Sequence, residues 1–207
     1  MTYEDFVRSA TRPLPVPFVP EITLLTADDP FELWEATGAE PPPFWAFPWA
    51  GGQGLARYLL DQPTVVKKKR VAEVASGSGL VAIAAALAGA GEVTATDIDP
   101  CALAAIALNA AGNGVTVRAR SLDLIAAEPP DADVVLAADI FYERAVAPRA
   151  LEFARRVRET GADVLIADPG RAFLPAAALR EIGHYEVPVN KSLEDADTRR
   201  VTVYRLA

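Results

Sequence analysis

The sequence predicts an α/β fold in which helices cover both faces of a mostly parallel β-sheet that ends in an antiparallel hairpin. Three observations lead to this prediction. Short apolar segments alternate with alanine-rich helical segments from residue 51 onward, which is typical of parallel βαβ units. The last two strand-like segments, 184–190 and 199–207, have no helical pattern between them, so they must pair antiparallel. A glycine-containing loop follows the first apolar strand, at the place where such sheets bind ligands.

The first 50 residues are expected to form a proline-rich leader that packs on the core as a lid. Prolines recur between positions 13 and 48 and exclude long helices there. They leave room for one short helix near 30–37 and one short strand at 21–27. The leader has too few apolar residues for a core of its own, so we do not expect it to fold as an independent domain.

Residues 51–207 are expected to form the main domain. Its first element is a helix that begins at residue 51 and ends before Pro63. The predicted strands that follow are 70–75, 92–97, 115–120, 132–139 and 162–168. The predicted helices between them and before the hairpin are 79–91, 100–114, 143–161 and 175–182. With the hairpin, the sheet has seven strands.

Composition narrows the functional classes. A chain of 207 residues suits one well-buried domain, and its net charge of −8 argues against a nucleic-acid-binding surface. The single cysteine excludes an internal disulfide and a zinc site built from cysteines. The N-terminus lacks the features of a signal peptide, and the alanine runs are too short to cross a bilayer. We therefore expect a cytoplasmic, monomeric protein with no bound metal and no membrane or nucleic-acid partner.

The loop after the first predicted strand can be interpreted in two ways. Gly77, Gly79 and Ala82 match the G-x-G-x-x-A pattern of dinucleotide-binding proteins. Glu73 lies just ahead of the loop, where its carboxylate would repel a pyrophosphate. The same carboxylate would favour the sulfonium and ammonium of S-adenosylmethionine, so the sequence favours that cofactor.

Two further segments extend the predicted cofactor site. Asp97 ends the second strand, twenty residues after Gly77, where a carboxylate can accept hydrogen bonds from both ribose hydroxyls. Leu122 and Asp123 follow the third strand, where an adenine ring would lie.

With these residues assembled, the chain resembles the class I, seven-strand S-adenosylmethionine-dependent methyltransferases, which have a Rossmann-like fold. Within them it is most similar to the family-16 protein lysine methyltransferases, and in particular to those that act on the electron transfer flavoprotein beta subunit. An older label for such sequences is nicotinamide N-methyltransferase-like. The segments that carry the resemblance are 43–61, 71–90, 96–110, 138–143 and 166–171.

The resemblance implies a set of cofactor-binding residues, which includes Trp49 closing over the methionine end together with Gly51 and Gly52. Ala75 stands where the family usually has the first glycine of the loop, and it fits if its backbone φ is negative. The implied residues are Trp49, Glu73, Ala75, Gly77, Gly79, Asp97, Ile98, Leu122, Asp123 and Ala138.

The segment "ADIFYE" carries the implied substrate site. Asp139 is expected to hold and orient the lysine ammonium, and Phe141 and Tyr142 to form a dry aromatic wall that favours a cation. An Asp139 that merely caps a helix is the alternative. The "DPGR" turn at 168–171 either borders the substrate entrance or is structural.

The resemblance therefore implies a protein lysine N-methyltransferase, with the electron transfer flavoprotein beta subunit as its partner. A small-molecule N-methyltransferase of the nicotinamide type is the first alternative. A nucleotide-binding oxidoreductase and an inactive binding module with the same fold are the others.

Overall fold

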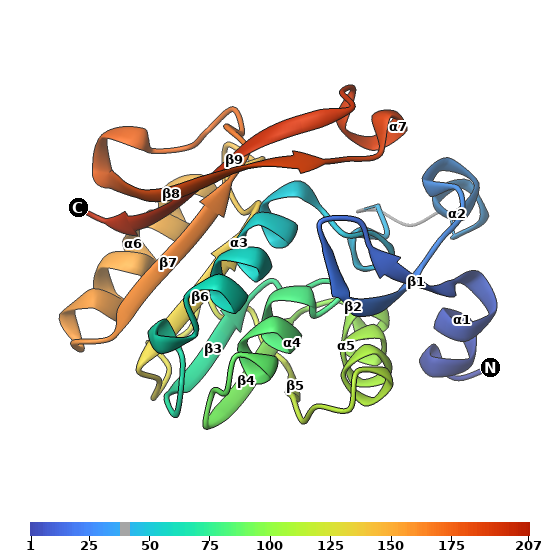
Figure 1. Cartoon of the computed structure of the whole chain (residues 1–207), viewed down its shortest axis with the longest axis horizontal. Helices are drawn as coiled ribbons and strands as arrows, with labels where there is room; N and C mark the ends of the chain where they lie inside the picture. Colours follow the sequence, from blue (N-terminus) through green and yellow to red (C-terminus); the bar gives the residue numbers. More distant parts are fainter. Residues whose placement is uncertain (38–41) are drawn as a thin grey trace.

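The computed structural model describes residues 1–37 and 42–207, and at its centre is a seven-stranded sheet with the order β5-β4-β3-β6-β7-β9-β8 (Figure 1). The strands from β5 to β7 pair in parallel, and β9 pairs antiparallel with β7 and β8. This confirms the predicted fold class and its hairpin. The strands are β3 (Arg70–Val74), β4 (Glu92–Asp97), β5 (Arg118–Ser121), β6 (Val134–Ala138), β7 (Asp163–Asp168), β8 (Leu179–Pro188) and β9 (Thr198–Leu206).

The helices of the main domain surround this sheet. Among the described residues, no helix is both long and apolar enough to cross a membrane. The main-domain helices are α3 (Ala50–Asp61), α4 (Leu80–Leu87), α5 (Pro100–Gly112), α6 (Ala147–Glu159) and the one-turn α7 (Lys191–Glu194).

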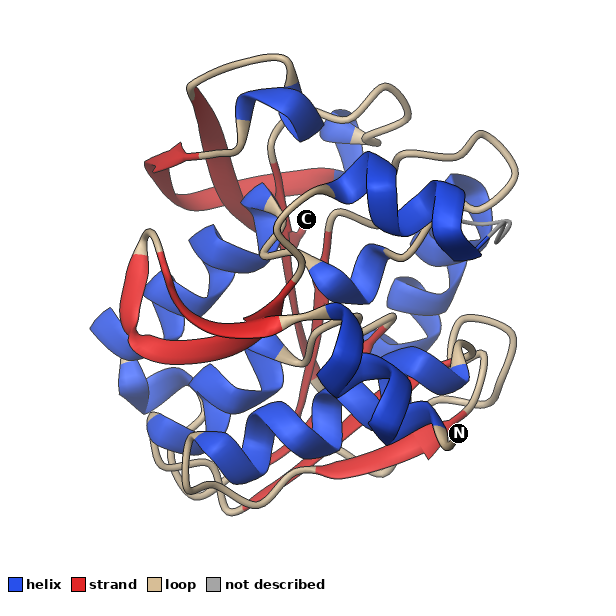
Figure 2. Cartoon of the chain, turned by 90° about the vertical axis from the view of Figure 1, so that its right-hand side faces the viewer, coloured by secondary structure: helices blue, strands red, loops and turns tan. Residues whose placement is uncertain are grey.

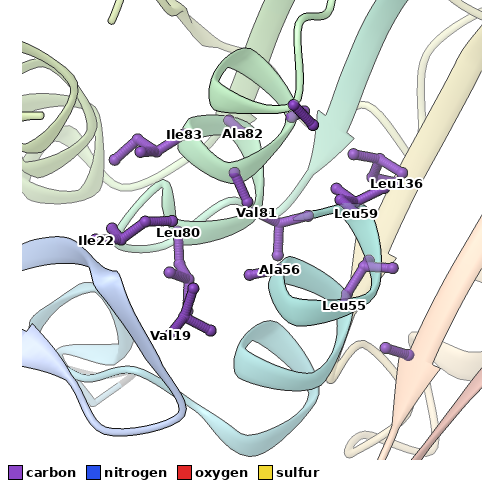
Figure 3. Packing of buried hydrophobic residues seen from close by; sticks show 14 of the residues in the cluster. Val19, Ile22, Leu55, Ala56, Leu59, Leu80, Val81, Ala82, Ile83 and Leu136 are labelled. Atoms are coloured by element: carbon purple, nitrogen blue, oxygen red, sulfur yellow. The ribbon is translucent and has the colours of Figure 1, made fainter. Parts of the chain in front are cut away.

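Both faces of the sheet are buried, and the alternation of side chains along β6 shows it. Val134 and Leu136 belong to the apolar cluster of α3 and α4, which Figure 3 shows from close by. Val135 and Ala137 belong to the cluster of α6 on the other face. A strand buried on both sides explains why this segment is apolar at every position.

The N-terminal segment contains α1 (Tyr3–Ala10), β1 (Arg12–Val16), β2 (Val19–Thr26) and α2 (Pro30–Thr37). Figure 1 shows these elements on one side of the molecule, and Figure 2 views that side. Val19 and Ile22 of the β1–β2 hairpin pack beside Leu80 of α4 (Figure 3). Trp45 packs with Ala105 of α5 in a separate cluster, so the leader shares the core of the main domain.

The helix α1 and the strand β1 of the leader were missing from the prediction. Thr2 and Asp5 form a reciprocal capping box at the start of α1, a signal that was present in the sequence. The strand β1 contains Pro13 and Pro15, which argued against regular structure. Prolines are tolerated there because β1 is an edge strand, in which every second N–H points away from the partner.

The predicted helix at 175–182 is wrong. A short 3₁₀ turn at Ala176–Ala178 leads directly into β8, which pairs with β9 along its whole length. The alanines and the leucine of this stretch favour a helix, but pairing with β9 overrides that local preference. The predicted strand thus begins five residues earlier than expected, at Leu179 instead of His184.

A buried glutamine connects three parts of the molecule near the site. The Gln53 side chain, which is 1% exposed, accepts a hydrogen bond from the Phe18 N–H at 3.1 Å. Its amide nitrogen donates to the carbonyls of Pro48 at 2.9 Å and Pro188 at 3.4 Å. Gln53 therefore fixes the N-terminal hairpin and the end of β8 against the segment that carries Trp49.

Candidate active site

A cavity of about 380 Å³ lies at the carboxyl ends of β3, β4 and β6, where the strand order reverses between β3 and β6. This is where open α/β sheets bind their ligands. The predicted site residues that line it are Trp49, Glu73, Ala75, Gly77, Asp97, Ile98, Ala138, Asp139 and Tyr142.

The glycine loop supports the cavity through its backbone. Gly77 has a φ of +53° and donates its N–H to Asp97 Oδ2 at 2.9 Å. Gly79 has a φ of +80° and precedes the first turn of α4. It does not line the cavity; a Cβ there would lie 3.2 Å from Cγ1 of Ile106, so this glycine lets α4 pack closely on α5.

The expectation of a negative φ at Ala75 is wrong. Ala75 has a φ of +48°, in the left-handed region that favours glycine. The loop therefore adopts a glycine-like backbone conformation at a residue that carries a Cβ. An L-residue in that region carries about 1 kcal/mol of steric strain.

Ala75→Gly is expected to raise the free energy of unfolding by about 0.5–1 kcal/mol, because it removes the strain at positive φ. Urea unfolding of the two proteins measures the difference. Ala107→Gly, on the exposed face of α5, is the matched control and is expected to lower the same free energy by about 0.5–1 kcal/mol. A fall in stability for Ala75→Gly would contradict the left-handed backbone.

Glu73 is buried beneath the loop, with 3% of its surface exposed. Its Oε2 accepts a hydrogen bond from the Ala82 N–H in the first turn of α4, at 3.0 Å. Burial raises the pKa of Glu73 to about 8, and the nearby charge of Asp97 acts in the same direction. A cation in the cavity would stabilise its ionised form, which agrees with the predicted preference for a cationic ligand.

Asp97 presents a pre-oriented carboxylate to the cavity. Its two oxygens accept hydrogen bonds from the backbone N–H groups of Gly77 and Asp99, at 2.9 and 3.0 Å. Each oxygen retains acceptor capacity for a ligand hydroxyl. Ile98 follows, 67% exposed, and offers an apolar surface at the cavity edge.

Leu122 and Asp123 do not reach this cavity. The Asp123 carboxylate is exposed, pairs with Arg149 at 3.2 Å and accepts from the Ala126 N–H at 3.2 Å. Leu122 packs with the α6 side of the sheet, and its N–H donates to the Asp97 carbonyl at 3.1 Å. Leu122 is thus next to Asp97 along the backbone, but neither Leu122 nor Asp123 lines the cavity.

Asp139 directly follows β6 and is held by two groups. Its Oδ2 accepts a hydrogen bond from the Gly52 N–H at 3.1 Å, and its Oδ1 accepts from Nε and Nη2 of Arg171 at 3.0 and 2.7 Å. Its φ is +55°, a conformation that Asp tolerates better than most residues. Burial raises the pKa of Asp139 to about 6, although Arg171 opposes this shift. Near neutral pH the carboxylate is therefore mostly ionised.

Sequence reasoning left the "DPGR" turn undecided and missed its main contact. Oδ1 of Asp168 accepts hydrogen bonds from the N–H groups of Gly170 and Arg171, at 2.7 and 2.6 Å, which shapes the turn. Arg171 then reaches both Asp139 and Glu194 of α7. The turn could be read from its Asp-Pro-Gly composition, but no sequence signal pointed to Glu194.

The predicted aromatic wall needs a correction. Phe141 is fully buried in the cluster under α6 and does not line the cavity. Tyr142 does, and its ring contacts Phe44 edge-on with centroids 5.5 Å apart. The Phe44 ring also contacts the Trp49 ring, with centroids 5.7 Å apart. The Phe44 carbonyl accepts a hydrogen bond from the Trp49 indole N–H at 2.8 Å. The wall is therefore built from Phe44, Trp49 and Tyr142.

Comparisons with known proteins place this chain in a family. Residues 56–162 match the model described as ribosomal protein L11 methyltransferase (PrmA). The chain is 36% identical to the electron transfer flavoprotein beta subunit lysine methyltransferase of Danio rerio, over 80% of this chain and 66% of that protein. It is 37% identical to the protein of that name from Xenopus laevis, over 81% and 70%. The match thus spans about two thirds of the length of these relatives.

A solved structure supports the fold. Magnesium protoporphyrin IX methyltransferase from Synechocystis PCC 6803, with bound S-adenosylmethionine, is similar with a TM-score of 0.53 and 14% identity, over 74% of this chain and 76% of that chain. The resemblance seen in the sequence is confirmed: this chain belongs to the family of the electron transfer flavoprotein beta subunit lysine methyltransferases, which use S-adenosylmethionine as methyl donor.

Proposed function

We propose that the substrate of this methyltransferase is a lysine of the electron transfer flavoprotein beta subunit. The observation that carries the proposal is the ionised Asp139 carboxylate, fixed beside Tyr142 in the wall of the cavity. A fixed carboxylate next to aromatic rings is suited to an alkylammonium group. The names of the relatives supply the identity of the protein partner.

The residues of the cavity fit S-adenosylmethionine. Asp97 can accept from the ribose hydroxyls, Ile98 offers an apolar surface for the adenine, and Glu73 is a carboxyl group whose ionised form the cationic methionine end would stabilise. When bound, the cofactor supplies an electrophilic methyl group. A pyrophosphate would instead face the carboxyl groups of Glu73, Asp97 and Asp99. The arginine among the described lining residues, Arg171, is already paired with Asp139 and Glu194.

The protein's own groups must prepare the lysine for attack. A free lysine amine has a pKa near 10.4, so about one molecule in 2,500 is neutral at pH 7. Asp139 receives and orients the ammonium. Packing of the lysine side chain against Phe44, Trp49 and Tyr142 removes water from it. This desolvation favours release of the ammonium proton to bulk solvent and leaves the neutral amine that carries the required lone pair.

Methyl transfer from tritium-labelled S-adenosylmethionine to purified electron transfer flavoprotein tests the proposal. We expect label in the beta subunit, located on lysine by mass spectrometry of its peptides. Nicotinamide and a soluble extract serve as competing acceptors. Label confined to small molecules, or to another protein of the extract, would overturn the proposed substrate. The relatives do not favour the nicotinamide-type or oxidoreductase alternatives.

We expect kcat/KM for a lysine substrate to rise with pH in two regimes at saturating cofactor. The reaction needs a neutral amine and an ionised Asp139. Above about pH 7 the amine alone limits the rate, and log kcat/KM gains about one per pH unit. Below the Asp139 pKa of about 6, protonation of this carboxyl adds a second factor and the slope approaches two.

A pH series of initial rates from 5 to 9 measures these slopes. Arg171 lowers the pKa of Asp139, and the neighbouring carboxylates Glu194 and Asp168 raise it. The residual activity of Asp139→Asn is expected to keep a slope of one throughout. A slope of one for the wild-type protein down to pH 5 would show that Asp139 does not act as a carboxylate.

A further inference from the structure

One guanidinium, that of Arg171, is shared by two buried carboxylates. Nη1 and Nη2 donate to Oε2 and Oε1 of Glu194 at 2.9 and 2.8 Å, while Nε and Nη2 donate to Oδ1 of Asp139 at 3.0 and 2.7 Å. The side chains are 21% exposed for Arg171, 14% for Asp139 and 3% for Glu194. The ammonium site expected at Asp139 is therefore already occupied by a cation of the protein itself.

The two carboxylates hold Arg171 differently. Glu194 uses both of its oxygens in a fork-to-fork pair, the strongest arrangement for arginine and carboxylate. Asp139 uses a single oxygen, because its other oxygen accepts from Gly52. If the hydrogen bonds between Arg171 and Asp139 break, Arg171 is still paired with Glu194 through its Nη atoms. Breaking them therefore leaves no unpaired buried guanidinium.

The positions of the three groups suit such a move. Arg171 and Asp139 line the cofactor cavity, whereas Glu194 lines a neighbouring cavity of about 230 Å³. Phe47 and Trp49 line both cavities and separate them. The guanidinium lies 5.9 Å from the Trp49 ring centroid, so Arg171 sits at the boundary, with Glu194 on the far side from the reaction.

The charges around Asp139 determine how a lysine ammonium can bind there. An incoming ammonium needs the negative charge of Asp139, which the Arg171 guanidinium already neutralises through two hydrogen bonds to Oδ1. Two cations cannot share that carboxylate without repulsion, which a buried site hardly screens. Exchange of one cation for another leaves Asp139 paired with the ammonium and Glu194 paired with Arg171.

We propose that Arg171 is a positioning residue that occupies the ammonium-binding carboxylate Asp139 until substrate arrives, and that Glu194 retains Arg171 when the lysine displaces it. The inference rests on the proposed function in requiring a lysine substrate, but it does not depend on which protein carries that lysine. While no substrate is bound, Arg171 neutralises the charge of Asp139. The strength of the pair between Glu194 and Arg171 determines how readily Arg171 leaves Asp139.

Binding of n-butylamine, whose ammonium and alkyl chain match a lysine side chain, tests this at pH 8 with saturating S-adenosylhomocysteine. In the wild-type protein, we expect the Nε–H signal of Arg171 to shift in NMR as the amine is added, because that N–H loses Asp139. An amine that binds without moving this signal would overturn the proposal.

Two variants and their combination make the test quantitative. Glu194→Gln weakens the second anchor, so Arg171 should compete harder for Asp139 and amine affinity should fall about tenfold. Arg171→Met removes the competitor, so the amine should bind at least as well as to wild type. In the Arg171→Met background, Glu194→Gln should no longer change the affinity. If Glu194 has a purely structural role, Glu194→Gln will lower amine affinity in both backgrounds. If Arg171→Met loses amine binding, Arg171 contacts the amine and does not compete with it. Either result overturns the proposal.

Arg57 provides a closely matched control. Its side chain is 20% exposed and also bridges two carboxylates, Glu21 at 2.7 Å and Asp61 at 2.9 Å, away from the cavity. Arg57→Met and Glu21→Gln should leave amine affinity unchanged, while melting curves and cofactor titration verify the fold of every variant. If the flavoprotein is not methylated but the amine still displaces Arg171, the proposed substrate fails and this inference stands.

Discussion

Asp139→Asn is expected to reduce methyl transfer to lysine by about 100-fold or more while cofactor affinity changes little. Loss of one partner from a buried, hydrogen-bonded charge pair typically costs about 2–5 kcal/mol, and every 1.4 kcal/mol is about tenfold. The carboxamide can still accept the Gly52 N–H but offers no charge to an ammonium. The effect should therefore fall on the lysine substrate and not on the cofactor.

Asparagine is the informative replacement because of the backbone at this position. Asp139 has a φ of +55°, where alanine would add backbone strain. A lower rate of an alanine variant could then arise from lost stability as well as from the lost carboxylate. Asparagine tolerates the left-handed region, and Arg171 remains paired with Glu194 in the variant. We therefore expect a melting temperature close to that of the wild type.

Single-turnover rates with labelled cofactor, together with cofactor titration, measure this loss. The matched control is Asp133→Asn, at the other end of the same strand: Asp133 precedes β6 and Asp139 follows it. Asp133 pairs with Arg70 at 2.8 Å and does not line the cavity, so its replacement should leave the rate unchanged. Full activity of Asp139→Asn would remove Asp139 from the substrate site.

The parts of the site that lie at the carboxyl ends of strands could be predicted from the sequence. Glu73, Asp97 and Asp139 each occupy a position fixed by the end of a parallel strand, and the carboxyl ends of such strands meet at one edge of the sheet. Strand periodicity and glycine placement are local properties, so the sequence alone carries them. The structure accordingly brings these three carboxylates to one cavity.

The parts that failed depend on contacts distant in sequence or on a single dihedral angle. Once β6 ends at Ala138, alternation no longer says which of Phe141 and Tyr142 faces the cavity. The contact between Phe44 and Tyr142 joins residues nearly 100 positions apart, and Glu194 reaches Arg171 from the hairpin linker. The positive φ of Ala75 could not be predicted from the sequence, because alanine rarely adopts this conformation.

The glycine pair in the first turn of α3, Gly51 and Gly52, shows how such long-range contacts determine which residues a short motif can contain. A Cβ on Gly51 would lie 2.5 Å from Oδ2 of Asp139 and 2.8 Å from the backbone carbonyl oxygen of Ala167. A Cβ on Gly52 would lie 3.7 Å from Leu80, in ordinary contact. The absence of a Cβ at Gly51 therefore lets α3 approach the Asp139 carboxylate, whereas Gly52 contributes its N–H.

Gly51→Ala is accordingly expected to lower the free energy of unfolding by about 3 kcal/mol and the methyl-transfer rate by about 100-fold. The methyl group cannot fit without moving Asp139 or the end of β7, and overpacking of this kind costs about 1–3 kcal/mol or more. A displacement of about 1 Å at a reacting site can cost about 100-fold in rate. Because the rate loss arises from a misplaced Asp139, it should not add to that of Asp139→Asn in the double variant.

Urea unfolding and single-turnover rates of Gly51→Ala, Asp139→Asn and the double variant measure both effects. Gly112→Ala is the control: this glycine lies in α5 with no atom within 4 Å of an added Cβ, so alanine there should be neutral or stabilising. Additive rate losses in the double variant would mean that Gly51 acts on the reaction through something other than Asp139. A Gly51→Ala protein as stable and active as wild type would show that α3 lies farther from Asp139 than the 2.5 Å approach requires.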